Sequence, residues 1–260
     1  MLREKFNLDL AVLDRFTVLF HGAFGGGKTH LLGDALRYES AKGPVRFLNI
    51  RGEDGALSIA NFGLGTVGET VDKLEDFQTA LAEYRGENIR ALAIDGGKHY
   101  GKMVIKSVCG DRAPSVGRNS DDWSQIHKKF EDTLISLKSV APVVIMASSS
   151  DRSIDQVSGE LSLTPDMPGR QAAGVAGMFD FVFVIKTVAT GPNSVSREIL
   201  TAPIANTIIR QRLPRPLPAT IKIPENGGGW KALVDAMQLC LDQAPAGVVV
   251  AQRQLAGVKK

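Results

Sequence analysis

The chain has 260 residues, of which 43% are hydrophobic, and a formal net charge of +3 at pH 7. This composition supplies a core for one large domain and excludes global disorder, and the mild charge means that a polyanionic partner would have to meet a local basic patch. The two cysteines, Cys109 and Cys240, are far apart in sequence and predict no disulfide framework. The amino-terminal stretch is charged, unlike a secretory signal, and no apolar run reaches the length of about 18 residues that a membrane span needs. We therefore expect a cytoplasmic protein.

Apolar strands alternate with helices along most of the sequence. The β-branched and aromatic segment 15–20 predicts the first strand, a glycine-rich loop follows it, and a helix is expected over 28–38. Further apolar strands are predicted at 45–50, 89–95, 142–147 and 179–185, and helices with one apolar face at 71–84 and 123–137. Strands of this kind that alternate with helices predict a mostly parallel α/β sheet covered on both faces.

The pattern changes after residue 186. Short, closely spaced strands separated by Pro and Gly are predicted at 197–201, 207–212 and 220–223, and they favour β-hairpins that extend one edge of the sheet. A short helix is expected near 230–241. We therefore divide the chain into an amino-terminal segment (1–15), a core domain (16–241) and a carboxy-terminal tail (242–260).

Two long segments, 96–119 and 148–176, show no strong periodicity and are interpreted as loops. Each follows the carboxyl end of a predicted strand, where α/β sheets bind ligands. Loops of this length in a compact domain are usually functional or mobile. The sequence therefore directs attention to this edge of the sheet.

The glycine-rich loop fits the pattern G-x-x-x-x-G-K-[ST]. Glycines allow successive backbone N–H groups to turn toward a phosphate chain, and the helix that follows directs its positive end at the same place. The lysine supplies a cation for the β- and γ-phosphates, and the threonine offers its hydroxyl to Mg²⁺. The nucleotide-binding residues predicted from this motif are Gly22, Ala23, Phe24, Gly25, Gly26, Gly27, Lys28, Thr29 and His30.

Two acids follow predicted strands. Asp95 ends the strand at 89–95, where a carboxylate can hold a water of the Mg²⁺ shell, although an Asp-Gly-Gly sequence also suits a simple turn. Glu53 comes just after the strand at 45–50 and could orient a water against the γ-phosphate, but taken alone it is equally typical of a helix cap or a solvated turn.

Taken together, these residues resemble the RecA-like P-loop ATPases. The likeness is greatest to a small phage branch, AAA-domain nucleotide-binding proteins that act in single-strand annealing and recombination, and it extends over about 16–229 with its strength in the motifs. The resemblance implies a RecA-like P-loop NTPase core with ATP and Mg²⁺ as cofactors. It also makes Glu53 the preferred catalytic base, with its neighbour Asp54 as a substitute.

In this family a late strand carries two basic residues that reach the ATP of the neighbouring subunit, and the sequence IIRQRLPRPL matches it with Arg210 and Arg212. The resemblance therefore implies a filament or ring in which subunits share active sites, although the same arginines could form an ordinary solvated strand face. The residue that senses the γ-phosphate after the fourth strand would be Ser148 or Ser149, where bacterial RecA has glutamine.

The two long segments correspond to the family loops that contact DNA. The segment 96–119 carries five basic residues against Asp111, a net charge of +4, and Tyr100 offers a ring for base stacking. A solvated basic loop is the alternative. The segment 148–176 has four acids against two arginines, a net charge of −2, which suits phosphate poorly. The predicted DNA-binding residues are Lys98, Lys102, Lys106, Arg112 and Arg118.

The sequence thus predicts a Mg²⁺-dependent ATPase that assembles on single-stranded DNA and does not bind a membrane. One alternative is a nucleotide-gated phage assembly or packaging factor that binds protein rather than DNA, which the acidic second segment favours. Another is a small-molecule or nucleotide kinase, but no arginine-rich lid follows the fourth strand.

Overall fold

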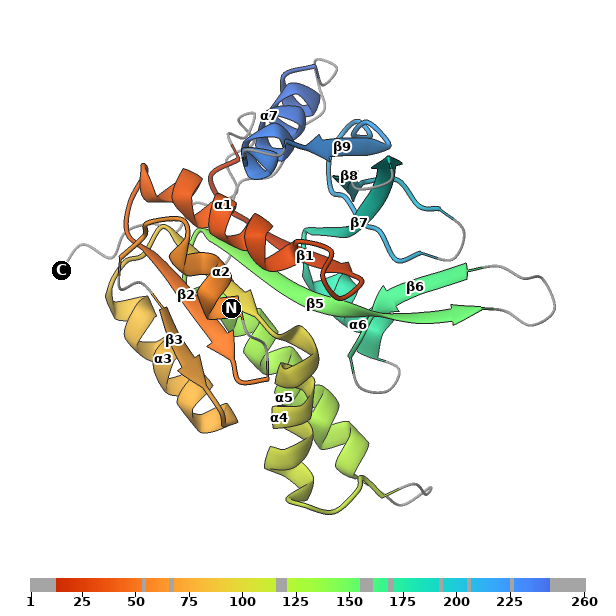
Figure 1. The fold of residues 1–260 in the computed structure, drawn as a ribbon. Coiled ribbons are helices and arrows are strands. Elements are labelled where there is room, and N and C mark those ends of the chain that lie inside the picture. The colour runs from red at the N-terminus through yellow and green to blue at the C-terminus, as the bar shows by residue number, and fades with distance from the viewer. Residues whose placement is uncertain are drawn as a thin grey trace.

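In the computed structural model, a mixed β-sheet is covered by helices on both faces (Figure 1). The structure describes residues 13–52, 55–65, 68–115, 121–154, 161–167, 171–191, 194–204, 207–224 and 227–243. The strands in these ranges are β1 (Phe16–Gly22), β2 (Val45–Ile50), β3 (Gly68–Val71), β4 (Ala91–Asp95), β5 (Val143–Ile154), β6 (Leu161–Pro165), β7 (Phe181–Gly191), β8 (Ser194–Leu200) and β9 (Thr220–Ile223). The helices are α1 (Lys28–Ser40), α2 (Gly55–Ala60), α3 (Leu74–Gly86), α4 (Gly97–Cys109), α5 (Asp122–Leu137), α6 (Gln171–Met178) and α7 (Gly229–Asp242).

Within the described residues the strand order is β3-β2-β4-β5-β1-β7-β8-β9, and β6 pairs with the outer part of β5. The strands from β3 to β7 in this order are parallel, whereas β8, β9 and β6 are antiparallel to their neighbours. Because β5 lies between β1 and β4, the carboxyl ends of these three strands meet at one edge. This topology confirms the predicted architecture, a mostly parallel α/β sheet flanked by helices, with antiparallel strands from the C-terminal part of the chain at one edge.

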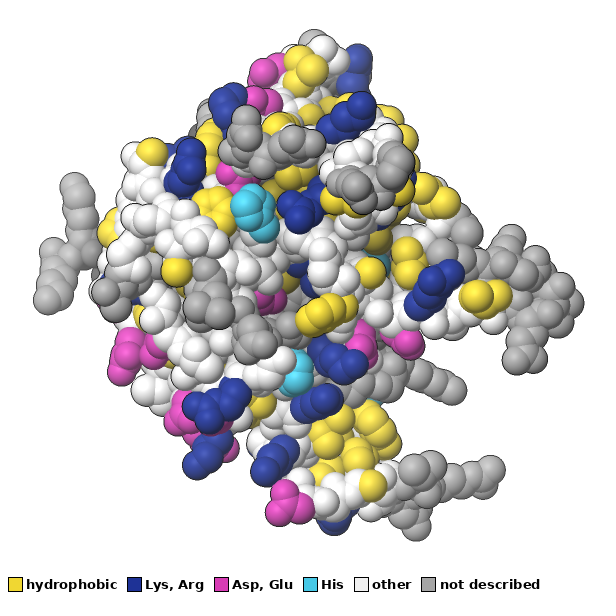
Figure 2. Space-filling model, viewed as in Figure 1, with side chains coloured by type: hydrophobic (Ala, Val, Ile, Leu, Met, Phe, Trp, Pro, Cys, Tyr) yellow, Lys and Arg dark blue, Asp and Glu magenta, His cyan; other side chains and the backbone are white. Residues whose placement is uncertain are grey.

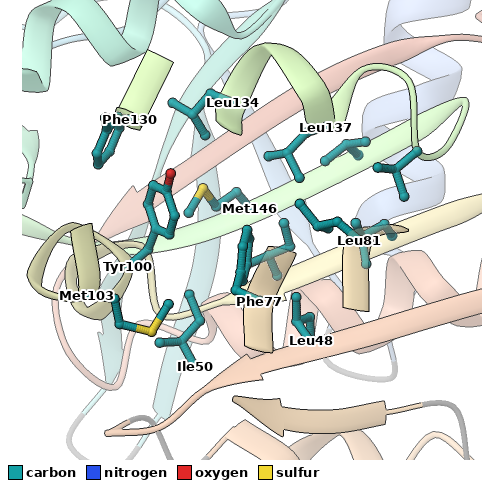
Figure 3. Close-up of a cluster of buried hydrophobic side chains, with 14 of the residues drawn as sticks. Leu48, Ile50, Phe77, Leu81, Tyr100, Met103, Phe130, Leu134, Leu137 and Met146 are labelled. Atoms are coloured by element: carbon teal, nitrogen blue, oxygen red, sulfur yellow. The ribbon is translucent and has the colours of Figure 1, made fainter. Parts of the chain in front are cut away.

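Two hydrophobic clusters lie on opposite faces of the sheet. The first cluster packs α3, α4 and α5 against the strands, and Figure 3 shows its rings and aliphatic side chains meeting between the helices and the sheet. Tyr100, Phe77 and Phe130 form its aromatic centre, with ring centroids 4.8–5.2 Å apart. The second cluster packs α1 and α7 on the other face around Trp230. The two-sided burial explains why β1, β4 and the first half of β5 are almost entirely apolar in sequence.

Two buried acids of α1 hold α7 in place. The carboxylate of Asp34 accepts hydrogen bonds from the backbone N–H groups of Gly228 and Trp230, at 2.9 and 2.8 Å, and so caps the start of α7. Glu39, which is 1% exposed, accepts from the indole N–H of Trp230 and pairs with Arg90 at the start of β4. The carboxy-terminal helix is therefore attached to the helix that follows the glycine-rich loop.

Several predicted elements need correction. The segment 96–119 is not a loop, because residues Gly97–Cys109 form α4. The segment 148–176 contains the outer half of β5, β6 and α6. The predicted strand at 207–212 is reduced to one bridge between Arg210 and Val182. The proposed division into 1–15, 16–241 and 242–260 stays a prediction, and most of its two end segments lie outside the described residues. Among the helices described, none is long and apolar enough to cross a bilayer.

Candidate functional site

The glycine-rich loop connects the end of β1 to the start of α1. A Cβ on Gly22 would lie 2.3 Å from the carbonyl oxygen of Ile185 on β7, so only glycine fits where the two strands pair. Gly27 has φ 90° and takes the left-handed conformation just before α1. The first turn of α1 contains no acid, so no carboxylate of its own competes for its N–H groups. The loop therefore has the form that a phosphate-binding turn requires.

Lys28 folds back across this loop. Its ammonium group donates to the carbonyl oxygens of Gly22 and Ala23, at 3.1 and 2.8 Å, which holds the charge over the loop. Phe24 at the loop tip is 94% exposed, and Gly25 and Ala23 are also exposed, while Gly26 is buried. His30 turns away from the loop and packs on Phe62, with ring centroids 4.9 Å apart.

The structure brings Thr29 and Asp95 together. The Thr29 hydroxyl donates to Asp95 Oδ2 at 2.5 Å, and Asp95 is 3% exposed at the end of β4. A hydroxyl and a carboxylate are hard oxygen donors of the kind that Mg²⁺ prefers, and Mg²⁺ bound this way takes its remaining ligands from phosphate and water. The pair therefore fits the predicted metal site. Among the described residues no group of three or more His, Cys, Asp or Glu offers an all-protein metal site instead.

The predicted base lies outside the described residues, as does its alternative. Residues 53–54, which are Glu53 and Asp54, fall between two segments that the structure places. On one side, a Cβ on Gly55 would lie 2.5 Å from Asp95 Oδ2 and 3.0 Å from the Thr29 methyl carbon. On the other, a Cβ on Gly52 would lie 2.4 Å from the His99 ring. The residue after 53–54 therefore packs against Thr29 and Asp95, and the residue before 53–54 packs against the first turn of α4.

Ser148 and Ser149 lie at the carboxyl end of β5, beside His21 and Gly22 of β1. Ala147 belongs to the cluster with α1, and side chains alternate along a strand, so Ser149 shares the face of the glycine-rich loop and Ser148 does not. Ser148 is buried and its hydroxyl lies 3.4 Å from the Asp166 carbonyl oxygen, whereas Ser149 donates to the Asp166 carboxylate at 3.2 Å. Ser149 is thus the better placed of the two for a phosphate.

His21 precedes the loop and is fully buried on the opposite face. Its ring nitrogens lie 2.8 Å from the Ser150 hydroxyl and 2.9 Å from the Ile208 carbonyl oxygen. Burial lowers the pKa of His21 to about 4, and the nearby charge of Lys28 acts in the same direction. The imidazole is therefore neutral at pH 7 and links the end of β1 to the base of the β5–β6 hairpin.

Arg210 and Arg212 do not reach the glycine-rich loop of their own chain. Arg212 pairs with Asp180 at 3.2 Å, and the same carboxylate accepts from the backbone N–H of Thr17 near the start of β1. Arg210 donates to the carbonyl oxygen of Ala176 at 3.4 Å. Because β1 runs across the sheet from Thr17 to the loop, Arg212 lies at the edge opposite the phosphate site.

Three of the predicted DNA-binding residues, Lys98, Lys102 and Lys106, lie on a helix and not on a loop, and Arg112 follows its end. Tyr100 is 0% exposed in the core and burial raises its pKa, so the prediction that its ring stacks on bases is wrong. Lys98, Lys102 and Lys106 recur every four residues along α4, and Figure 2 shows basic side chains gathered over this helix. Arg118 lies outside the described residues.

Much of this basic charge is paired within the chain. Lys98 lies 2.6 Å from Asp166, and Lys106 lies 3.4 Å from Asp111. Arg112 forms a two-point contact with Asp122, which lowers the pKa of that carboxyl. In the part of the chain described, Lys102 is exposed and has no ion pair.

Sequence reasoning missed Arg197 on β8. A Cβ on Gly27 would lie 2.7 Å from Arg197 Cδ, so this side chain contacts the glycine-rich loop. Its position in the strand was visible, since it falls in the predicted strand 197–201. The sequence carries no signal that Arg197 reaches the loop, because that contact depends on how β8 pairs with β7.

No protein-family model and no curated protein sequence matches the chain. The solved structures that resemble it include the crystal structure of a KaiC-like protein from the hyperthermophilic archaeon Pyrococcus horikoshii OT3. That likeness has a TM-score of 0.44 at 14% sequence identity, and it covers 80% of this chain and 90% of that chain. The function has to be inferred from the residues of this chain.

Proposed function

We propose that the protein is a Mg²⁺-dependent ATPase of the RecA-like P-loop type. The observation that carries this proposal is the 2.5 Å contact between Thr29, which follows the glycine-rich loop, and Asp95, which ends a different strand. A glycine turn that matched the motif by chance would have no reason to meet a buried strand-terminal acid. Lys28 lies across the same loop, so a cation, a hydroxyl and a carboxylate converge at the start of α1.

These residues divide the work of phosphoryl transfer to water. The loop amides and Lys28 bind and orient the β- and γ-phosphates, and Thr29 and Asp95 would hold Mg²⁺. When bound, the metal neutralises charge that develops on the phosphate oxygens. Glu53 accepts the proton of the attacking water, and Ser149 or Ser148 contacts the γ-phosphate from the end of β5. The packing of Gly55 on Asp95 supports Glu53 in this role.

The first experiment measures ATP binding by calorimetry, with and without Mg²⁺. Lys28→Ala should abolish binding, because it removes the cation held over the loop. Asp95→Asn should keep binding without Mg²⁺ and lose the increase that Mg²⁺ gives. Unchanged ATP affinity in Lys28→Ala, in a variant that melts like the wild type, would contradict the proposal.

The second experiment identifies the base. Glu53→Gln should bind ATP normally and lose turnover, because the amide keeps the shape but cannot accept a proton. Asp54→Asn is the matched control on the adjacent residue and should retain turnover. The reverse result would assign the base to Asp54.

We further propose that the protein acts on single-stranded DNA in recombination or annealing, as an oligomer. The three lysines of α4, Lys98, Lys102 and Lys106, support this step, since Lys102 at their centre is exposed. Arg210 and Arg212 would complete the site of a neighbouring subunit. Their distance from the loop of their own chain supports action in trans, and the Arg212 side chain is 49% exposed.

One observation favours a second candidate, a nucleotide-gated phage assembly or packaging factor that binds protein. The acids that pair with Lys98, Lys106 and Arg112 reduce the charge that α4 and the turn after it can offer to phosphates. Stimulation of ATP hydrolysis by single-stranded DNA would favour the DNA-binding function. Hydrolysis that does not respond to DNA would favour the protein-binding one.

A further inference from the structure

Arg197 lies directly against the glycine-rich loop. A Cβ placed on Gly27 would be 2.7 Å from Cδ, 2.8 Å from Nε and 3.4 Å from Cζ of this arginine. Gly27 is the residue just before α1, where the helix N–H groups are directed at a phosphate. The guanidinium therefore sits beside the place where the nucleotide phosphates are expected.

The pairing of three strands explains this position. Gly22 pairs with Ile185 on β7, and Arg197 pairs with Thr187, two residues further along β7. Ile199 belongs to the hydrophobic cluster under α1, and side chains two apart share a face, so Arg197 is on the α1 face of β8. The β7–β8 hairpin thus holds the arginine beside the loop on a paired strand, which positions it better than a flexible loop would.

Among the residues that the structure describes, the Arg197 side chain has a buried donor without an acceptor. Arg197 Nε is buried and makes no hydrogen bond within the described residues. The adjacent acid, Glu198, points to the other face of β8 and pairs there with Lys186 at 3.0 Å. A buried donor of a charged group costs free energy unless an acceptor meets it, so this geometry calls for an anionic ligand.

We propose that Arg197 is a phosphate-binding residue that the same chain supplies to its own nucleotide. The planar guanidinium suits two phosphate oxygens at once, so it would contact a di- or triphosphate and discriminate against a monophosphate. This inference rests on the proposed ATPase function and adds a residue to the same site. It also differs in kind from the roles of Arg210 and Arg212, which require a second subunit.

The test compares the affinities of Arg197→Ala, Arg197→Lys and the wild type for ATP, ADP and AMP, by calorimetry with Mg²⁺. Arg197→Ala should weaken ATP and ADP binding by about 10- to 100-fold, the usual loss for a charge-assisted hydrogen bond. The preference for ATP and ADP over AMP should fall with it. Arg197→Lys should recover part of the loss, because it restores the charge without the two-point geometry.

Lys222→Ala is the matched control. Lys222 is exposed on β9, directly across from Glu198, so this variant removes one positive charge from the same hairpin region away from the loop. It should bind nucleotides like the wild type. If Arg197→Ala fails to fold, Arg197→Gln keeps most of the side chain and replaces it in the comparison with Arg197→Lys.

The outcomes separate this inference from the function on which it rests. Wild-type affinity in Arg197→Ala or Arg197→Gln, with binding abolished in Lys28→Ala, would overturn the role of Arg197 and leave the ATPase proposal standing. A wild-type protein that binds none of the three nucleotides would overturn both.

Discussion

Thr29 and Asp95 are 66 positions apart in sequence and share a 2.5 Å hydrogen bond. Their residue types and their places after a glycine loop and at a strand end were enough to predict a metal pair. The contact itself depends on the placement of β4 one strand away from β1, with β5 between them. At the residue scale, the sequence motif therefore identifies the two candidate metal ligands, and the strand order brings them into contact.

His21 should make stability depend on pH. Its pKa is about 4 in the folded protein, because it is buried, and about 6.5 in an unfolded chain. The unfolded chain binds more protons between these values, so the free energy of unfolding should rise with pH from about 4 to about 6.5 and then level off. The slope contributed by one proton is about 1.4 kcal/mol per pH unit, or roughly 3 kcal/mol in all.

Urea denaturation across this pH window measures the effect. The variant His21→Gln keeps a polar side chain and removes the titrating group, so its stability should change less steeply with pH than that of the wild type. Equal slopes in the two proteins would mean that another group carries the pH dependence.

At the scale of elements, the cap on α7 gives a second prediction. Asp34→Ala removes the carboxylate that accepts from the N–H groups of Gly228 and Trp230, and it leaves the Trp230 donor buried and the Gly228 donor partly buried without this acceptor. The free energy of unfolding should fall by about 1–3 kcal/mol. Asp235→Ala is the control, because its pair with Lys231 is exposed to solvent and should contribute little to stability. Equal losses in the two variants would contradict the role of the cap.

The same scale shows how far the sequence could be read. The strand at 45–50 has the predicted bounds, and α1, α5 and α7 each lie within a few residues of prediction, since large apolar side chains mark their buried faces. Helix α4 was missed although Tyr100, Met103 and Val104 are buried on it at helical spacing. Glycines precede its first turn and occupy Gly97 and Gly101, and glycines in a row are typical of a loop, so this short apolar face was overlooked.

The outer half of β5 was missed for a different reason. Residues Ser150–Ile154 pair with β6 beyond the main sheet and are polar or exposed, so they carry no buried-strand signal. The same limit applies to the candidate site. Lys28, Thr29 and Asp95 belong to local motifs. Arg197 instead reaches the glycine-rich loop because of the register in which β8 pairs with β7, and no local sequence pattern specifies that register.

At the scale of the whole molecule, the proposal that the lysines of α4 bind single-stranded DNA can be tested. Lys102→Glu should weaken binding and flatten the log–log salt dependence by roughly 0.7, because one fewer counterion is released. Lys222→Glu makes the same charge change on β9, far from α4 in Figure 1, and should have little effect. Binding is measured with an ATP analogue over a range of salt concentrations. If the two variants bind alike, α4 is not the DNA-binding surface.

Assembly provides the last prediction. If Arg212 serves a neighbouring site, Arg212→Ala should lower ATP hydrolysis at least tenfold in the assembled protein. Mixing it with Lys28→Ala subunits should restore part of the activity, since mixed interfaces combine an intact loop with an intact arginine. The absence of recovery at every ratio, with mixed assembly confirmed, would confine Arg212 to its ion pair with Asp180.

The two ends of the main strand order limit how such an assembly can form. The outermost strands, β3 and β9, are only four residues long, and they carry Glu69 and Lys222 on exposed positions. Short, charged borders give an incoming strand few backbone groups to pair with, which protects a protein from uncontrolled stacking. Subunits that joined edge to edge would gain little, so we expect a filament or ring of this protein to be held by side-chain contacts between faces. Its growth would then be sensitive to single surface substitutions.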